Sequence, residues 1–473
     1  MSKKYATYKD SGIEWIGEIP KHWKIRPLKY NTYLKARVGW HGLKSDEFGK
    51  EGAYCVTGTD FYNGRIRWEG CYRVSNDRYG EDPYIQLKEG DLLITKDGTI
   101  GKTAIVINLP GEATLNSGVF VVRPKKDYTS RFLYWVLNSC VFTEFVNYHS
   151  KGSTIIHLYQ DTFCNLPLAL PAPQEQEFIT NYLDQKTALI DDTIQKKQRL
   201  IDLIQEERTA LINQAVTRGL DPDVKLKPSG LKWLGDVPEH WELKKLKYFS
   251  TLISGAAFNS SEFKREGDVR VLKISNIQHD WIDWSDVEYL TEEYAKNFKH
   301  FEILDGDLIF ALTRPIISTG IKSARAYNDK DSAPVLLNQR NATLRVSQGV
   351  NPDFIYYVTH SRYFFQLFEA SIDNTGQQPN ISPIAISNFE ILLPPLSEQN
   401  VIVEYITQAL DNIKAVQQKI QKEITLLQEY RAALINEVIT GKRRVFHDIA
   451  PGEIPMMLSE FSTRTGKVQP AEA

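Results

Sequence analysis

One unusual segment occurs twice in this chain. Residues 11–30 read SGIEWIGEIPKHWKIRPLKY, and residues 229–248 read SGLKWLGDVPEHWELKKLKY. Half of the aligned positions are identical, among them two tryptophans, two glycines, a proline and a histidine. The copies begin 218 residues apart. Solenoid repeats have a much shorter period of roughly 20–50 residues. The repeat therefore predicts a duplicated domain, and the fold must contain two related halves.

The similarity continues through each half. Three further pairs of segments align: residues 56–68 with 272–284, 87–95 with 303–311, and 131–139 with 353–361. In the second pair, a Gly-Asp step before apolar residues predicts a turn into a strand. In the third pair, Asn351 and Pro352 predict the start of a helix. Each copy is therefore predicted to be a mixed α+β module of about 150 residues.

The segments between these framework pieces differ between the two copies. Residues 96–106 read KDGTIGKTAIV, whereas the facing region, residues 312–327, reads LTRPIISTGIKSARAY. A shared scaffold with divergent loops is how one fold presents two different binding surfaces.

Each module is followed by a long segment without proline or glycine, residues 174–218 and 396–440. The two segments align without gaps, from an EQ pair near the start to an ALIN motif near the end. Apolar residues recur every three or four positions over about six heptads, which predicts coiled-coil helices. The predicted packing positions are Ile179, Leu183, Ile190, Ile194, Ile201, Ile204, Leu211, Ala215, Ile402, Ile406, Ile413, Val416, Ile420, Ile424, Leu427, Leu434 and Val438.

The order of these segments predicts the architecture. Two duplicated α+β domains are separated by two long antiparallel coiled-coil helices and are related by a pseudo-two-fold axis. The predicted boundaries are residues 1–170 for the first module, 171–220 for the first helix, 221–393 for the second module, 394–441 for the second helix and 442–473 for a flexible tail.

Composition limits the environment of the chain. No apolar run approaches the roughly 20 residues that cross a bilayer, and the first residues lack the apolar core of a signal peptide. All four cysteines lie in the first half and form no CxxC pair, so we expect neither disulfides nor zinc, in a reducing cytoplasm. The net charge of −2 neither indicates nor excludes nucleic-acid binding, which would need local basic patches or partners that supply positive surface.

No motif for catalysis is evident. GTIGKT at residues 98–103 lacks the spacing of a phosphate-binding loop, because Lys96 stands where glycine is required. NPDF at residues 351–354 is explained by helix capping. There is no HExxH, GxSxG or Cys/His zinc pattern. His22 and His240 each precede a tryptophan, which favours packing over catalysis. We therefore predict no enzyme activity, no cofactor and no metal.

The repeated SGIEWIGEIPKHW and SGLKWLGDVPEHW segments, the two EQ helix starts, and the helix ends RTALINQAVTRGL and RAALINEVITGK resemble the specificity subunit of type I restriction–modification systems. The resemblance covers the chain to about Lys442. It implies two target-recognition domains that each read half of a bipartite site in double-stranded DNA. It also implies that the helices set the spacing and hold two methyltransferase subunits, which endonuclease/translocase subunits join.

Two other readings remain open at this point. The chain is also compatible with the specificity chain of a combined type II-like cutter–methylator. A coiled-coil interaction scaffold that does not bind DNA would keep the same helices.

DNA contacts are predicted from polar and basic residues in the divergent loops, where glycine permits close approach of the backbone. For each residue alone, a solvated surface role is the competing explanation. The candidates in the first module are Arg65, Arg67, Lys96, Thr99, Lys102, Lys151, Ser153 and Thr154. Those in the second module are Arg314, Ser318, Lys322, Gln377, Gln378 and Asn380.

Overall fold

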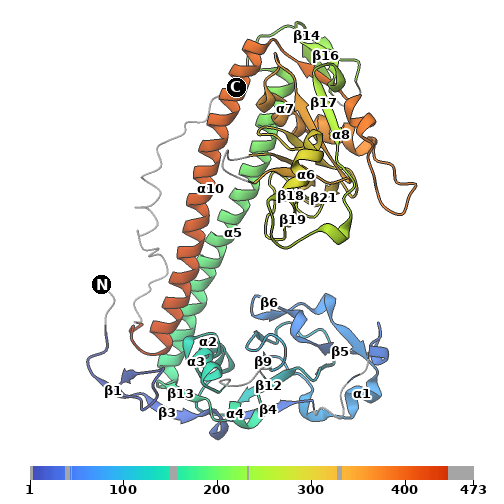
Figure 1. The fold of residues 1–473 in the computed structure, drawn as a ribbon. Helices are drawn as coiled ribbons and strands as arrows, with labels where there is room; N and C mark the ends of the chain where they lie inside the picture. The colour runs from blue at the N-terminus through green and yellow to red at the C-terminus, as the bar shows by residue number, and fades with distance from the viewer. Residues whose placement is uncertain are drawn as a thin grey trace. The chain divides into compact units, whose positions relative to one another are not determined.

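The computed structural model describes residues 4–37, 43, 45–149, 157–231, 234–327 and 333–445. The chain divides into two compact units (Figure 1). The first unit comprises Met1–Lys196 with Glu423–Ala473, and the second comprises Lys197–Lys422. Two long helices, α5 (Pro173–Arg218) and α10 (Leu396–Ile439), each contribute one part to each unit. Both helices begin and end within one residue of the proline- and glycine-free segments 174–218 and 396–440, and within two residues of the predicted boundaries 171–220 and 394–441.

The first unit is built on a six-stranded sheet and a three-stranded sheet. The larger sheet has the order β4 (Thr32–Ala36), β12 (Val119–Pro124), β9 (Leu92–Thr95), β10 (Thr103–Ile105), β7 (Arg65–Ile66) and β6 (Phe61–Tyr62). The smaller has the order β11 (Ala113–Leu115), β5 (Ala53–Val56) and β8 (Tyr72–Val74). Strand β9 is buried along its whole length, and helix α2 (Ser130–Leu137) packs against it. The predicted helix at residues 131–139 is thus confirmed.

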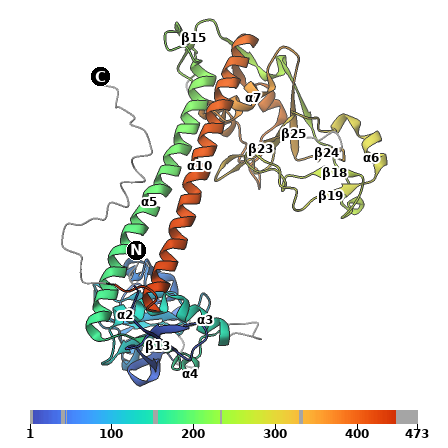
Figure 2. The same ribbon diagram turned by 90° about the vertical axis from the view of Figure 1, so that its left-hand side faces the viewer.

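The second unit repeats the order of the first four strands of the larger sheet and of all three strands of the smaller one. Its four-stranded sheet has the order β17 (Ser250–Ser254), β25 (Asn341–Val346), β20 (Leu308–Ala311) and β23 (Ser323–Arg325). Its three-stranded sheet has the order β19 (Glu288–Leu290), β18 (Val269–Leu272) and β24 (Val335–Leu337), with α6 (Glu292–Asn297) against β18 (Figure 2). In both units the small sheet combines one parallel and one antiparallel pair. The duplication therefore extends from sequence to strand order.

The repeated segment closes each module. It forms a hairpin and then a strand that pairs with the last strand before the long helix. In the first unit these strands are β1 (Tyr8–Asp10), β2 (Glu18–Pro20), β3 (Lys24–Pro27) and β13 (Pro167–Leu170). In the second they are β14 (Leu226–Pro228), β15 (Asp236–Pro238), β16 (Glu242–Lys245) and β26 (Glu390–Leu393). The start and the end of each module are thereby held together.

The Gly-Asp steps begin central strands, as predicted, and each aspartate has a buried function. Asp91 receives two hydrogen bonds from Arg123, both of 2.7 Å. Asp307 receives two from Arg345, of 2.9 and 2.6 Å. Both carboxylates are buried, so each side-on pair fixes a strand start to the neighbouring strand of its sheet.

The remaining elements are short. The helices are α1 (Asn76–Gly80), α3 (Cys140–His149), α4 (Gln160–Phe163), α7 (Pro352–Thr359), α8 (Arg362–Ala370) and α9 (Pro383–Ser387). Strands β21 (Ile316–Ile317) and β22 (Gly320–Ile321) form a hairpin. Asn351 caps α7 by accepting from two backbone N–H groups, as the sequence predicts.

Each unit combines the beginning of one long helix with the end of the other. In the first unit, Ile179 and Leu183 of α5 share a core with Leu434 and Val438 of α10. In the second unit, Ile212 and Val216 of α5 share a core with Ile402 and Ile406 of α10. Every predicted packing position is buried or half-buried except Val416, which is 48% exposed, so that prediction was wrong. Heptad spacing also missed Ile212, Val216, Ile435 and Ile439, which lie in the cores that both helices share with the modules.

Two further expectations concern the environment of the chain. Within the described residues, no helix is both long and apolar enough to span a bilayer. The four cysteines are free thiols. Of the predicted tail, only residues 442–445 lie within the described part of the chain.

Candidate nucleic-acid interface

The repeated tryptophan-containing segment holds each module on its long helix. Glu175, in the first turn of α5, accepts hydrogen bonds from His22 Nε2 at 2.9 Å and Trp23 Nε1 at 3.3 Å. Glu398, in the first turn of α10, accepts from His240 Nε2 at 2.8 Å and Trp241 Nε1 at 3.0 Å. The side chains of both histidines are about half exposed, so their structural role comes from these contacts and not from burial in a core. The same contacts explain the glutamates of the EQ helix starts.

The ALIN motif holds the opposite end of each helix on a module. Asn436 of α10 accepts a hydrogen bond from the backbone N–H of Cys140, the first residue of α3, at 2.7 Å. Asn213 of α5 accepts one from Arg362, the first residue of α8, at 3.1 Å. Each side chain satisfies a backbone donor that a helix start leaves unpaired. The two units therefore use the same two attachments to position their loops.

In the first module, two of the predicted DNA-contacting segments converge. The Leu158 N–H donates to the Lys96 carbonyl at 3.0 Å, and His157 Nδ1 lies 2.7 Å from Asp97 Oδ1. This brings the chain directly after residues 150–156 to the loop that carries Lys96, Thr99 and Lys102. Thr99 and Lys102 are exposed, whereas Lys96 is half-buried and forms an ion pair with Asp97. Lys151, Ser153 and Thr154 lie outside the described residues.

Asp97 moderates the positive charge of this loop. Burial raises the pKa of its carboxyl, but hydrogen bonds from His157 and Lys96 outweigh burial, and the net effect lowers the pKa. The carboxylate therefore stays ionised and neutralises part of the charge of Lys96. Of Lys96 and Lys102, Lys102 is therefore the more available to an anionic ligand.

In the second module, the corresponding segments also converge. The Arg314 N–H donates to the Pro379 carbonyl at 2.8 Å, and the Ile381 N–H donates to the Leu312 carbonyl at 2.9 Å. The second bond is the counterpart of the bond between Leu158 and Lys96. Arg314 has a φ of 45°. This geometry puts the two sets of candidates in the second module side by side, with Arg314, Ser318, Gln377 and Asn380 exposed and Gln378 half-buried.

Lys322 differs from the other candidates. Its Nζ donates to the Ile274 carbonyl at 2.8 Å, and burial lowers the pKa of its amino group. One donor of this lysine thus supports the neighbouring loop, although sequence reasoning assigned it to the DNA surface.

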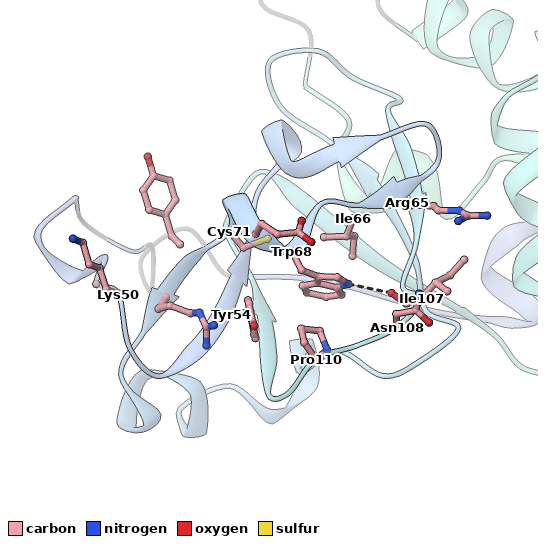
Figure 3. Close-up of a pocket in the computed structure, with 13 residues that line it drawn as sticks. Lys50, Tyr54, Arg65, Ile66, Trp68, Cys71, Ile107, Asn108 and Pro110 are labelled. Carbon is pink, nitrogen blue, oxygen red and sulfur yellow. Dashed lines mark hydrogen bonds between the residues drawn. The ribbon is translucent and has the colours of Figure 1, made fainter. Parts of the chain in front are cut away.

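Arg65 borders a pocket of about 730 Å³ in the first module (Figure 3). Lys50 and Arg65 lie on opposite sides of the Trp68 indole in this view, and the indole donates to the Ile107 carbonyl at 3.0 Å. Tyr54 also lines the pocket, and the Arg73 guanidinium lies 3.4 Å from the centre of its ring. Aromatic faces beside exposed cations suit a ligand that combines planar groups with negative charge.

Of the residues that line this pocket, sequence reasoning identified Arg65 but missed Lys50, Tyr72 and Arg73. Tyr54 and Arg73 are direct partners on β5 and β8, and this pairing cannot be read from their sequence separation. Arg67 is exposed and begins the short 3₁₀ helix Trp68–Gly70. In the second module, Trp281 aligns with Arg65 and is 55% exposed. The same position of the duplicated hairpin therefore carries different chemistry in the two modules.

Comparisons with known proteins identify relatives over nearly the whole chain. The family model "Type I restriction modification DNA specificity domain" matches residues 42–202 and 238–426. The MjaVIII specificity subunit of Methanocaldococcus jannaschii is 26% identical over 427 residues, covering 90% of this chain and 94% of the relative. The EcoKI specificity subunit of Escherichia coli K12 is 22% identical over 436 residues, covering 90% of each chain.

Solved structures share the fold. A chain from a study of complex assembly and conformational transition of the type I R-M system aligns with a TM-score of 0.65. It is 14% identical and covers 89% of this chain and 98% of that one. The HsdS subunit from Thermoanaerobacter tengcongensis aligns with a TM-score of 0.50 at 15% identity, with the same coverage.

Proposed function

The chain belongs to the type I restriction modification DNA specificity family, and on that premise we propose how its modules and helices divide the work of a specificity subunit. It gives a type I restriction–modification complex its DNA sequence specificity. Each α+β module is a target-recognition domain that reads one half of a bipartite site. The chain itself is non-catalytic, and partner subunits in the cytoplasm carry the adenine methyltransferase and ATP-dependent endonuclease activities.

One observation supports the proposal that each module recognises a different half-site. The modules share strand order and both helix attachments, whereas their hairpins and converging loops carry different polar and aromatic groups. The first module offers Arg65, Thr99 and Lys102, and the second offers Trp281, Arg314 and Gln377. Cations suit phosphates, and amides suit base edges. Two readers on one chain can recognise a site whose halves differ, whereas a homodimer mirrors a palindrome.

Exchange of one module tests this proposal. The Leu28 N–H donates to the Leu166 carbonyl at 2.9 Å, so residues 28–166 begin and end at neighbouring points. Replacing this segment with that of a relative should change one half-site in a methylome and leave the other intact. The matched exchange uses residues 246–389, because the Leu246 N–H donates to the Phe389 carbonyl at 3.0 Å. Alteration of both half-sites by a single exchange would contradict independent reading.

We further propose that α5 and α10 form an antiparallel coiled coil that sets the spacer of the site. Their 46 and 44 residues correspond to about 69 and 66 Å of helix. The proposal is supported by the shared cores of the start of each helix and the end of the other. Insertion of seven residues after Arg199 and after Lys422, which are aligned and exposed, keeps the heptad register.

The two insertions add about 10.5 Å to each helix. At about 3.4 Å per base pair, the spacer should grow by about three base pairs, with the half-site bases unchanged. Because the added DNA also twists, other insertion lengths should abolish methylation. If the longer protein methylated sites with the original spacer, the two helices would not set the spacer length.

The helices also offer equivalent exposed apolar residues, which we assign to methyltransferase docking. Leu203 and Leu426 occupy aligned positions and are 45% and 52% exposed. Leu203→Asp and Leu426→Asp should each remove one of two bound methyltransferase subunits in native mass spectrometry, because each introduces an unpaired charge into an apolar contact. The matched controls Gln205→Asp and Gln428→Asp add the same charge at aligned, exposed glutamines. Full occupancy in both leucine variants would refute this assignment.

A further inference from the structure

A cluster of two histidines and an aspartate lies in the second module. His279 and Asp280 are in the hairpin closed by the bridge between Ile277 and Ile282, and His360 follows the last residue of α7. One nitrogen of each histidine and one oxygen of the aspartate all lie within 4.8 Å of one another. The side chain of His360 is only 5% exposed, and the other two are about one-quarter exposed.

The hydrogen bonds of the two imidazoles orient them toward the carboxylate. His279 Nδ1 lies 2.9 Å from the Ile321 carbonyl, and His360 Nδ1 lies 2.7 Å from the Tyr356 carbonyl. A carbonyl oxygen only accepts, so each Nδ1 carries the proton. In the neutral rings, both Nε2 lone pairs are left facing Asp280, with His279 Nε2 3.9 Å from Oδ2 and His360 Nε2 in contact with Oδ1.

We propose that His279, Asp280 and His360 form a binding site for a divalent transition metal ion, with zinc as the best fit. Two imidazole nitrogens and one carboxylate oxygen are a zinc ligand set, and the fourth tetrahedral position is left for water. The Nδ1–H bonds to backbone carbonyls are the outer contacts that typically orient metal-binding histidines. Nothing in this proposal depends on DNA recognition by the module.

Two backbone features support the proposed metal site. Asp280 has a φ of 74°, in the left-handed region, and the aligned residue of the first module is Gly64. An aspartate is thus kept where glycine is the unstrained choice, as occurs at functional sites. Gly320 is the second feature, because a Cβ at this position would lie 2.7 Å from the His279 ring. The glycine therefore leaves room for the imidazole.

A positive charge also faces the cluster. Arg208 Nη2 of α5 lies 3.5 Å from Asp280 Oδ2. This arginine can hold the carboxylate oxygen that does not bind the ion, in the manner of an outer contact. The competing explanation is an ion pair in which protonated histidines donate to Asp280 without a metal. The two explanations differ in whether the purified chain binds zinc.

The site belongs to the second module alone. The aligned positions in the first module are Asn63, Gly64 and Asn138, which do not offer this ligand set. A bound ion would clip the hairpin to the end of α7 and fix the exposed Trp281 beside it. The function that follows is a structural clip for one of the two modules.

The test uses the full chain without an affinity tag, stripped with EDTA. The variants described below keep all four cysteines, so any binding by thiols would persist in them. Zinc is titrated in competition with a chromophoric chelator, and the stoichiometry is measured by elemental analysis. We expect one equivalent of zinc, and cobalt should give the intense visible absorption of a tetrahedral site. His279→Ala, Asp280→Asn and His360→Ala should each weaken binding by more than the roughly 10–100-fold that loss of an outer contact causes. His300→Ala, at an exposed histidine outside the cluster, should bind like the wild type.

Two results would overturn the site. One is the absence of stoichiometric binding by the wild-type chain, and the other is equal affinity in the Asp280→Asn variant. Circular dichroism without metal verifies that the variants fold. If His360→Ala does not fold, the test depends on Asp280→Asn, which keeps the shape of the side chain. A wild-type chain that binds no zinc but is destabilised by Asp280→Asn contains the ion pair instead.

Discussion

Replacement of Glu398 measures what the repeated tryptophan segment contributes to the second module. Glu398 accepts from the Trp241 indole, whose side chain is 1% exposed, and from His240, whose side chain is 48% exposed. In Glu398→Ala, the buried indole N–H loses its partner, at a cost of about 1–3 kcal/mol. The exposed histidine contact adds only about 0.2–1 kcal/mol. We therefore expect a loss of about 2–3 kcal/mol, most of it from the tryptophan.

Glu398→Gln separates the two contributions. Its amide oxygen can still accept from Trp241, so only the charge is lost, and we expect a cost of at most about 1 kcal/mol. Glu175→Ala and Glu175→Gln are the matched variants in the first unit, where Trp23 takes the place of Trp241.

Hydrogen exchange measured by mass spectrometry is the suitable assay. A chain of two units need not unfold in one step, and exchange reports the stability of each region separately. Glu398→Ala should lower protection in residues 234–254 and at the start of α10, and leave the first unit unchanged. A loss below about 0.5 kcal/mol, or an equal loss in Glu398→Gln, would show that the indole contact does not hold the module.

Three further predictions follow from burial and charge. Asp307→Ala removes the carboxylate partner of the Arg345 guanidinium and should cost about 3 kcal/mol in hydrogen-exchange protection of that sheet, as should Asp91→Ala in the first unit; an effect below 1 kcal/mol in both would contradict the role of the ion pairs. Burial raises the pKa of Cys55 and Cys71 to about 12, so both should remain thiols at pH 8 and alkylate slowly with iodoacetamide, and rapid labelling at that pH would be inconsistent with the structure. Ile420→Asn removes a buried side chain from α10 and should cost at least about 2 kcal/mol in hydrogen-exchange protection of that helix, whereas the same change at the exposed Val416 should be nearly neutral.

The elements that sequence predicted well are set by local chemistry. The long helices lack proline and glycine and end before Gly219 and Gly441, whose φ values of 75° and 72° suit a residue that terminates a helix. The Gly-Asp turns and the Asn351 cap also depend on neighbouring residues. The internal repeat then supported the other predicted elements, because the same pattern of residues occurs in both copies.

The features that sequence missed depend on pairings between distant segments. Lys322 was assigned to DNA because a lysine in a loop is usually solvated, but the Ile274 carbonyl lies within reach of its Nζ. Asp280 and His360 are 80 residues apart and match no metal-binding pattern. The aspartate and the arginine of each buried pair were both visible in sequence, but only strand order showed that they meet.

The attachments show why one chain carries both modules. Each module is held by a glutamate at the start of the helix that follows it and by an asparagine near the end of the other helix. The first module thus needs residues that lie 296 and 433 positions later, since Asn436 caps Cys140 and the Tyr8 hydroxyl donates to the Gly441 carbonyl at 3.2 Å. In the second unit the corresponding connection is continuous, because residues 219–229 join the end of α5 directly to the second module. Module identity therefore resides in the loops, whereas the attachments are common to both, which allows the loops to diverge without loss of the shared frame.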